Sequence, residues 1–210
     1  MYSNAEILNL LRALSVSETP FDEEKHQHLI IPTLENITDV YQQIRTVAEA
    51  FDAVERAEEL IENLEERINI VIHKLKFIPQ EQKQEVLLVN RLVPFEYGGS
   101  AYTDILIRTA GGKPPLTKPD GKIDAEVLII LARDKSLPHL LGELPMVFEL
   151  PEWKDVPAVK NNQVFLVDGT LRLQHHYAQI ADDIELLAEI LYPQYFVFGE
   201  NGESWIKFEM

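Results

Sequence analysis

The chain has 210 residues, 46% of them hydrophobic, and 35 acidic residues against 19 basic ones give a formal charge of −16. A surface this acidic repels phosphate backbones, which argues against a nucleic-acid-binding protein. The chain also has no run of about 20 apolar residues that would form a membrane span, and without cysteine it can form neither a disulfide nor a lipid-anchored cysteine.

The first residues turn polar at once and show no secretory leader. As written, the chain is therefore expected in the cytoplasm. If it is a fragment of an exported protein, it is expected in the periplasm or another extracytoplasmic compartment.

Helical patterns dominate the first 78 residues. A short amphipathic helix comes first, followed by a polar loop. Thr33 is expected to cap a second helix that carries apolar residues as far as Phe51. Asp52 with Glu55 is expected to cap a third helix, whose apolar residues recur at three- and four-residue intervals as far as Leu75.

Short apolar runs punctuate the second half and predict buried strands, at 85–89, within 125–132 and at 164–167. Helical patterns alternate with them, at 101–109, 136–141 and 180–191. This β-α-β-α-β order predicts a largely parallel sheet with right-handed crossovers. Trp153 is expected to lie under a proline-bounded turn, and the aromatic tail to form a hairpin around Asn201-Gly202.

The motifs of common enzymes are missing. Residues 110–113 lack the spacing of a phosphate-binding loop and end a helix instead of opening one. There is no Gly-x-Ser-x-Gly elbow and no cysteine nucleophile. Asp182, Asp183 and Glu185 fit a solvated helix face better than an acid/base pair. The sequence therefore predicts no enzyme, no cofactor and no metal centre.

Binding residues are expected where strands deliver their carboxyl ends, in the loops after Val89 and Val167. The second loop carries Gln174, His175, His176 and Tyr177. Histidine and tyrosine there could contact a ligand, because imidazole is a common ligand of transition metals and haem iron. The alternative is that these residues only cap or cover the first turn of the last helix.

Two strings near the C-terminus resemble a known family, PEWKDVPAVKNNQVFLVDG and IELLAEILYPQYF. Their Trp153, Ala158-Val159, Asp168-Gly169 and Leu187-Ala188 are similar to the C-terminal signature of ABC-importer substrate-binding proteins of the helical-backbone class. The cobalamin-binding members are most similar. The stretch from Pro32 to Ile68 is similar to the helix that joins the two lobes in that family.

This resemblance implies an α/β fold, with a single Rossmann-like lobe and a largely parallel sheet preceded by a long helical arm. The implied divisions are an N-terminal helix and loop over 1–31, the arm over 32–78 and the ligand-binding lobe over 79–210. The family's N-terminal lobe would be missing or reduced.

The resemblance also implies ligand contacts in the loop after the first strand. Relatives carry an aromatic-rich segment there, and in this chain Pro94, Phe95 and Gly98-Gly99 match it. Tyr97 lies in the same segment and is also expected to contact the ligand. Arg91 stands where relatives often have Trp, and Tyr102 stands near a second Trp position. Flat aromatic side chains suit the face of a corrin or porphyrin.

The function implied by the resemblance is a non-catalytic binding protein for cobalamin, haem or an iron-siderophore, which would work with an ABC transporter permease. The other wall of the site would then come from a second chain or a lost segment. The alternative is a structural or interaction protein, whose helical arm forms a homodimer or binds a partner through its apolar stripe.

Overall fold

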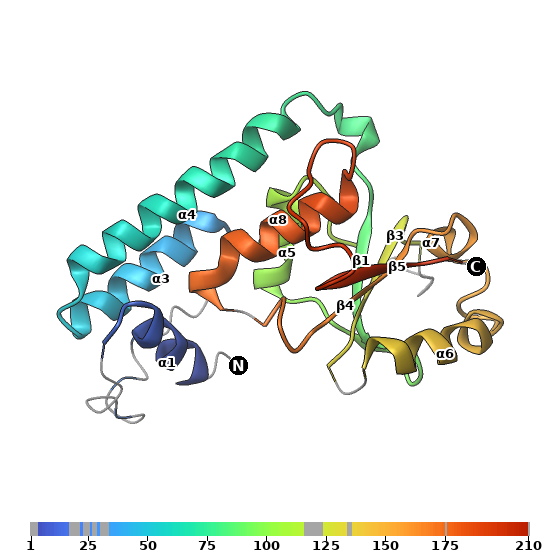
Figure 1. Ribbon diagram of the computed structural model, residues 1–210, viewed down its shortest axis with the longest axis horizontal. Coiled ribbons are helices and arrows are strands. Elements are labelled where there is room, and N and C mark those ends of the chain that lie inside the picture. The colour runs from blue at the N-terminus through green and yellow to red at the C-terminus, as the bar shows by residue number, and fades with distance from the viewer. Residues whose placement is uncertain are drawn as a thin grey trace.

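The computed structural model describes residues 4–16, 22, 26, 29, 34–115, 124–133, 136–174 and 176–209 (Figure 1). In chain order its elements are α1 (Asn4–Ala13), α3 (Ile37–Ala50), α4 (Val54–Leu75), η2 (Gln80–Gln82), β1 (Val86–Arg91), β2 (Glu96–Tyr97), α5 (Ala101–Thr109), β3 (Val127–Leu131), α6 (Leu137–Phe148), α7 (Pro157–Lys160), β4 (Val164–Val167), η3 (Tyr177–Gln179), α8 (Ile180–Leu191) and β5 (Trp205–Phe208).

The five strands form one sheet in the order β2-β1-β3-β4-β5. The three central strands run parallel, with Val86 opposite Val127 and Leu128 opposite Val164. The edge strands β2 and β5 are antiparallel to their neighbours. The predicted α/β fold with a largely parallel sheet is therefore confirmed.

Both faces of the sheet are covered, as the unbroken apolar runs of its central strands require. Alternate residues of β1 point to opposite sides, so that Leu88 joins one buried cluster and Leu87 the other. The first cluster contains the inner residues of α5 and α8, and the second those of α6 and α7. Trp153 lies in the second cluster and is only 1% exposed, as predicted for the residue under the proline-bounded turn.

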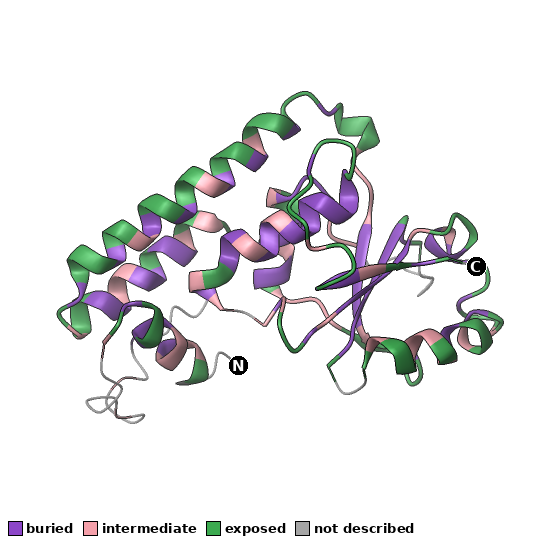
Figure 2. Ribbon diagram, in the orientation of Figure 1, coloured by how far each residue is buried: buried purple, intermediate pink, exposed green. Residues whose placement is uncertain are grey.

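The helical arm folds over the lobe. The apolar stripe of α4 faces α3 and α8, and its central members are fully buried, among them Ile61, Leu64 and Ile68. Figure 2 shows this division, with buried residues on the inner side of α4 and exposed ones along its outer side. The three-part domain division stays a prediction, but α1, α3 and α4 share one continuous core with the sheet.

Two predicted helix caps are wrong. The helix expected after Thr33 begins at Ile37. Asn36 Oδ1 accepts a hydrogen bond from the Thr38 backbone N–H, and the Asp39 carboxylate accepts one from the Asn36 N–H. Thr33 itself lies outside the described residues. Asp52 does not cap α4, because its backbone has φ 53° in a tight turn and Ala53 occupies the N-cap position.

Three other local predictions are also corrected. The helix expected to end at residue 141 continues through Pro145 to Phe148, because Leu144 and Phe148 are buried against the sheet. The tail forms no hairpin of its own; its aromatic alternation produces β5, which pairs with β4. Part of the loop expected after β1 forms β2, which pairs back onto β1.

The carboxylates at the start of α8 are not a solvated face. Arg67 of α4 donates from Nη2 to Asp182 at 2.5 Å and from Nε to Glu185 at 3.0 Å. Asp183 is 3% exposed, and its Oδ1 accepts from the Leu173 backbone N–H at 2.9 Å. Burial raises the pKa of Asp183 to about 7.

We predict that Arg67→Ala lowers the free energy of unfolding by about 1–2 kcal/mol, because it removes a partly buried, charge-assisted contact between α4 and α8. Urea unfolding measures this change. Arg45→Ala is the matched control, because Arg45 pairs with exposed Glu58 between α3 and α4 and its loss should matter less. If the two substitutions lowered the free energy of unfolding equally, the Arg67 contacts would have no special part in holding α4 to α8.

Asp183→Asn is expected to flatten the pH dependence of stability. The folded state holds the Asp183 proton more tightly than the unfolded chain does, so stability falls as pH rises from about 4 to about 7. Asparagine keeps an oxygen acceptor for the Leu173 N–H and does not titrate. Urea unfolding at pH 5 and pH 8 should therefore differ by roughly 2–3 kcal/mol less in this variant than in the parent.

Asp155→Asn is the control for that measurement. The exposed Asp155 carboxylate accepts from Lys160, which lowers its pKa, so it stays ionised between pH 5 and pH 8. An unchanged pH dependence in Asp183→Asn would show that this carboxyl is ionised in the folded protein.

Candidate functional site

A cavity of about 410 Å³ lies at the carboxyl ends of β1, β3 and β4, where the loops after these strands meet α1. We call it the rim cavity. Most of its lining is polar. The lining residues are Ala5, Glu6, Asn9, Asn90, Tyr97, Gly98, Gly99, Ser100, Arg133, Gln174 and His176. The two loops in which binding residues were predicted, after β1 and after β4, therefore meet in one place.

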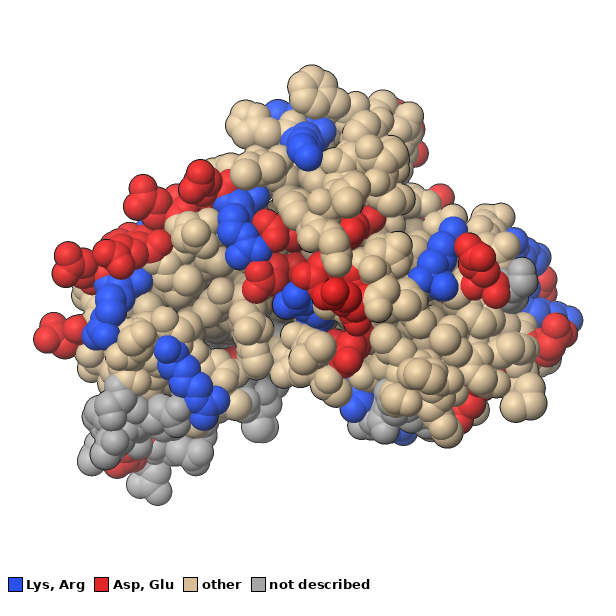
Figure 3. Space-filling model, in the orientation of Figure 1, with Lys and Arg blue, Asp and Glu red and all other residues tan. Residues whose placement is uncertain are grey.

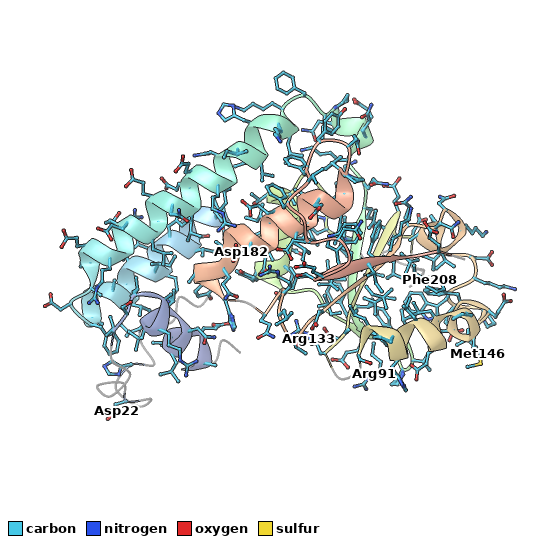
Figure 4. All side chains as sticks on the ribbon, viewed as in Figure 1. Asp22, Arg91, Arg133, Met146, Asp182 and Phe208 are labelled. Carbon is cyan, nitrogen blue, oxygen red and sulfur yellow. The ribbon has the colours of Figure 1, made fainter. Side chains whose placement is uncertain are left out.

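Arg133 stands at the centre of this rim, directly after β3 and its following Ala132. Its Nε donates to Asn90 Oδ1 at 3.2 Å, and its Nη2 donates to the Leu173 carbonyl at 2.9 Å. These bonds hold one guanidinium between the loops that follow all three parallel strands. In Figure 4 it lies near the lower edge of the view, between the helical part and α6. It is suited to bind a carboxylate or another anionic group.

The Tyr97 ring packs directly against the backbone of Gly99. A Cβ placed on Gly99 would come within 2.0 Å of the Tyr97 ring, so only glycine leaves room for the ring in this position. The ring is partly exposed and borders the rim cavity, and burial raises the pKa of its hydroxyl above the ordinary value. Ser100 follows and caps α5. A flat phenol is thus presented at the edge of the cavity.

Gln174 and His176 reach the same cavity from the loop after β4. The Gln174 amide donates to the Gly169 carbonyl at 3.1 Å and also to the Thr170 carbonyl, which closes the loop on itself. His176 Nδ1 lies 3.3 Å from Gln179 Oε1. His175 lies outside the described residues.

Tyr102 and Tyr177 do not reach the surface. Tyr102 is 0% exposed and Tyr177 3% exposed, and their ring centroids lie 5.8 Å apart in the core. The Tyr102 hydroxyl donates to the His176 carbonyl at 3.3 Å and lies 3.4 Å from Asp183 Oδ2. The prediction that these two tyrosines face a ligand is therefore corrected, because they support the loop from beneath.

Arg91 and Phe95 point to a different part of the rim. Arg91 borders a second, more apolar cavity of about 310 Å³ between β1, β3 and α6, and its guanidinium lies 3.8 Å from Glu96. Phe95 packs against Trp153, with ring centroids 5.9 Å apart. Among the described lining residues, Asn90 and Arg133 are the two that border both cavities. Of the predicted binding residues, Tyr97, Gln174 and His176 are brought together, whereas Arg91 and Phe95 lie apart from them.

Helix α1 supplies part of the other wall, which the sequence was expected to leave to a second chain or a lost segment. Ala5, Glu6 and Asn9 of α1 line the rim cavity, and α1 packs beside η3. Burial raises the pKa of Glu6 to about 7. Near neutral pH this carboxyl can therefore either donate or accept a hydrogen bond.

Arg133, Asn90, Glu6 and Asn9 were missed by sequence reasoning. A signal existed for the first two, because both follow the apolar runs of parallel strands, where ligands bind in open α/β sheets. No local signal marks the α1 residues, since only long-range packing brings them to the rim. Among the described residues, no group of three or more His, Asp or Glu side chains could hold a metal ion.

In the described ranges, no helix is both long enough and apolar enough to cross a membrane.

No family model matches the chain. It is 22% identical over 172 residues to the uncharacterized ABC transporter substrate-binding lipoprotein YvrC of Bacillus subtilis, a match that covers 80% of this chain and 54% of YvrC. An ABC transporter substrate-binding protein from Listeria monocytogenes superposes with a TM-score of 0.63 at 19% identity, covering 76% of this chain and 66% of that one.

The periplasmic haem-binding protein RhuT from Roseiflexus superposes with a TM-score of 0.57 at 23% identity, covering 76% of this chain and 64% of RhuT. Other solved structures with this fold are a possible iron-binding protein from Staphylococcus epidermidis and IsdE of S. aureus complexed with haem. The chain spans about half to two thirds of the length of these proteins. It therefore has the fold of the ABC-transporter substrate-binding proteins of the TroA-like, haem and siderophore type.

Proposed function

We propose that this chain is a non-catalytic binding protein that holds haem or another iron chelate at the rim cavity, as the substrate-binding component of an ABC importer. The observation that carries the proposal is that Tyr97 of β2, Arg133 after β3 and His176 after β4 line one cavity. The ligands named for proteins of the same fold support it.

The chemistry of the lining suits such a ligand. The His176 imidazole or the Tyr97 phenol can coordinate haem iron, and Arg133 can pair with a carboxylate of the ligand. The fixed hydrogen bonds of Arg133 to Asn90 and Leu173 leave little side-chain entropy to lose on binding. The proposal favours haem and iron chelates over a corrinoid, because the names of the related proteins include haem and iron.

The alternative, an interaction protein that pairs through its helical arm, has less support. The apolar stripe that would form such an interface includes Ile61, Leu64 and Ile68, and α3 and α8 already cover it. A homodimer through this stripe would require α4 to leave the lobe. A permease partner remains part of the main proposal.

Hemin titration followed by visible absorbance tests the proposal. We expect saturable binding to the parent chain with one ligand per chain, and at least tenfold weaker binding with a changed spectrum in His176→Ala. Arg133→Gln should weaken binding while leaving the iron spectrum unchanged. A ferric hydroxamate, followed by quenching of tryptophan fluorescence, tests the non-porphyrin arm.

His139→Ala is the matched control, because His139 is exposed on α6, where its Nε2 lies 3.0 Å from Glu143 Oε1 and outside the described lining of the rim cavity. It should bind hemin as the parent does. If His139→Ala and His176→Ala bind alike, or if neither ligand binds at high micromolar concentration, the rim cavity is not the binding site.

Gly99→Ala should lower hemin affinity several-fold without unfolding the chain. The added methyl group displaces the Tyr97 ring, which is free to rotate toward solvent. Gly142→Ala is the control, because a Cβ there meets nothing within 4 Å. Equal affinities of the two variants would show that the position of Tyr97 has no part in binding.

A further inference from the structure

The charge of α4 changes sharply along its length. From Val54 to Ile72 the chain holds six glutamates and two arginines, whereas from His73 to Lys83 it holds three lysines and one glutamate. In Figure 3 acidic side chains gather along α4 at the left. Basic ones stand at the top, where Figure 1 places the C-terminal end of this helix. An acidic molecule thus presents one basic end.

Exposed apolar side chains occur at this same end. Phe77 is 86% exposed and follows directly after Lys76. The Lys74 ammonium donates to the Tyr195 carbonyl at 3.1 Å and lies 5.2 Å from the centre of the Phe196 ring. This contact brings the segment after α8 to the end of α4, with Tyr195 51%, Val197 83% and Phe198 39% exposed.

A groove of about 390 Å³ opens beside the end of α4. Three of its lining residues are cations, Lys76, Lys83 and Arg108, and its other described lining residues are apolar or neutral. Arg108 lies 3.5 Å from Asp104, but within the described chain Lys76 and Lys83 take part in no ion pair. We call Lys74, Lys76, Phe77, Lys83 and the exposed side chains of 195–198 the basic tip.

We propose that the basic tip docks the protein on an anionic membrane surface. Such a surface supplies both partners that the tip lacks: a negative potential for the lysines and an interfacial apolar layer for Phe77, Tyr195 and Val197. An isolated small anion would satisfy the lysines but would leave the apolar side chains in water.

The overall charge of −16 opposes this docking. Its effect depends on how far the acidic residues lie from the membrane surface. Helix α4 has 22 residues and is therefore about 33 Å long, whereas electrostatic interactions decay over about 8 Å at physiological salt. Most glutamates of α4 therefore lie several screening lengths from a membrane that the tip touches. The acids nearest the lysines in the sequence are Glu81 and Glu85, each two residues from Lys83, and the three lysines of the tip outnumber them.

Vesicle sedimentation tests the proposal with the protein alone. We expect binding to phosphatidylcholine vesicles that contain phosphatidylglycerol at 0.05 M salt, release at 0.5 M salt, and no binding to pure phosphatidylcholine. The double substitution Lys76→Glu with Lys83→Glu should lower the partition coefficient at least tenfold. Phe77→Ser should lower it several-fold.

Matched variants separate the tip from general effects. Arg45→Glu with Arg56→Glu makes the same change in formal charge near the N-terminal end of α4, the end opposite the tip, and Met146→Ser removes an apolar side chain that is 72% exposed on α6. Both should change vesicle binding less than twofold. Circular dichroism checks that each variant is folded.

Absence of binding to anionic vesicles at low salt would overturn the proposal, as would equal losses in the tip and control variants. The measurement uses no hemin or chelate, so its failure leaves the proposed function of the rim cavity unaffected.

Discussion

The whole structure depends on the burial of α8 between two layers. Ten of its twelve residues are buried, because the sheet with α5 covers one side and α4 covers the other. Ile184, Leu187 and Leu191 fill the core on the sheet side, and the Arg67 contacts fasten the opposite side to α4. Without this helix the parallel strands would lose one of the two covers that they require, and α4 would keep α3 but lose the lobe helix that it packs on.

Much of the lobe could be predicted from local sequence. The central strands are unbroken apolar runs, and Gly111, with φ 90°, ends α5 where the glycine pair indicated a stop. The edge strands could not be predicted in the same way. Glu96 and Tyr97 form a strand because they pair with β1. The tail sequence by itself favoured a local hairpin, but its residues form β5 by pairing with β4.

The errors at the candidate site have a similar origin. Proximity to a strand end correctly predicted that the loops after β1 and β4 would meet, but it could not decide which side chains turn inward. Tyr102 and Tyr177 are aromatic and lie near the rim, yet both support the core beneath it. Asp183 is buried beside Tyr102. Its charge alone predicted a solvent-exposed face of the helix, so its burial could not be inferred from sequence. Arg133 has no motif of its own, and its position two residues after β3 was the signal for it.

The position of α1 has a consequence for ligand exchange. Glu6 and Asn9 border the cavity from α1, which packs against α3 and η3. A ligand larger than the rim cavity would displace this helix. The free energy needed to displace α1 would then weaken binding. The packing free energy of α1 would then determine which ligands bind, even among ligands that offer the same groups to Arg133 and His176.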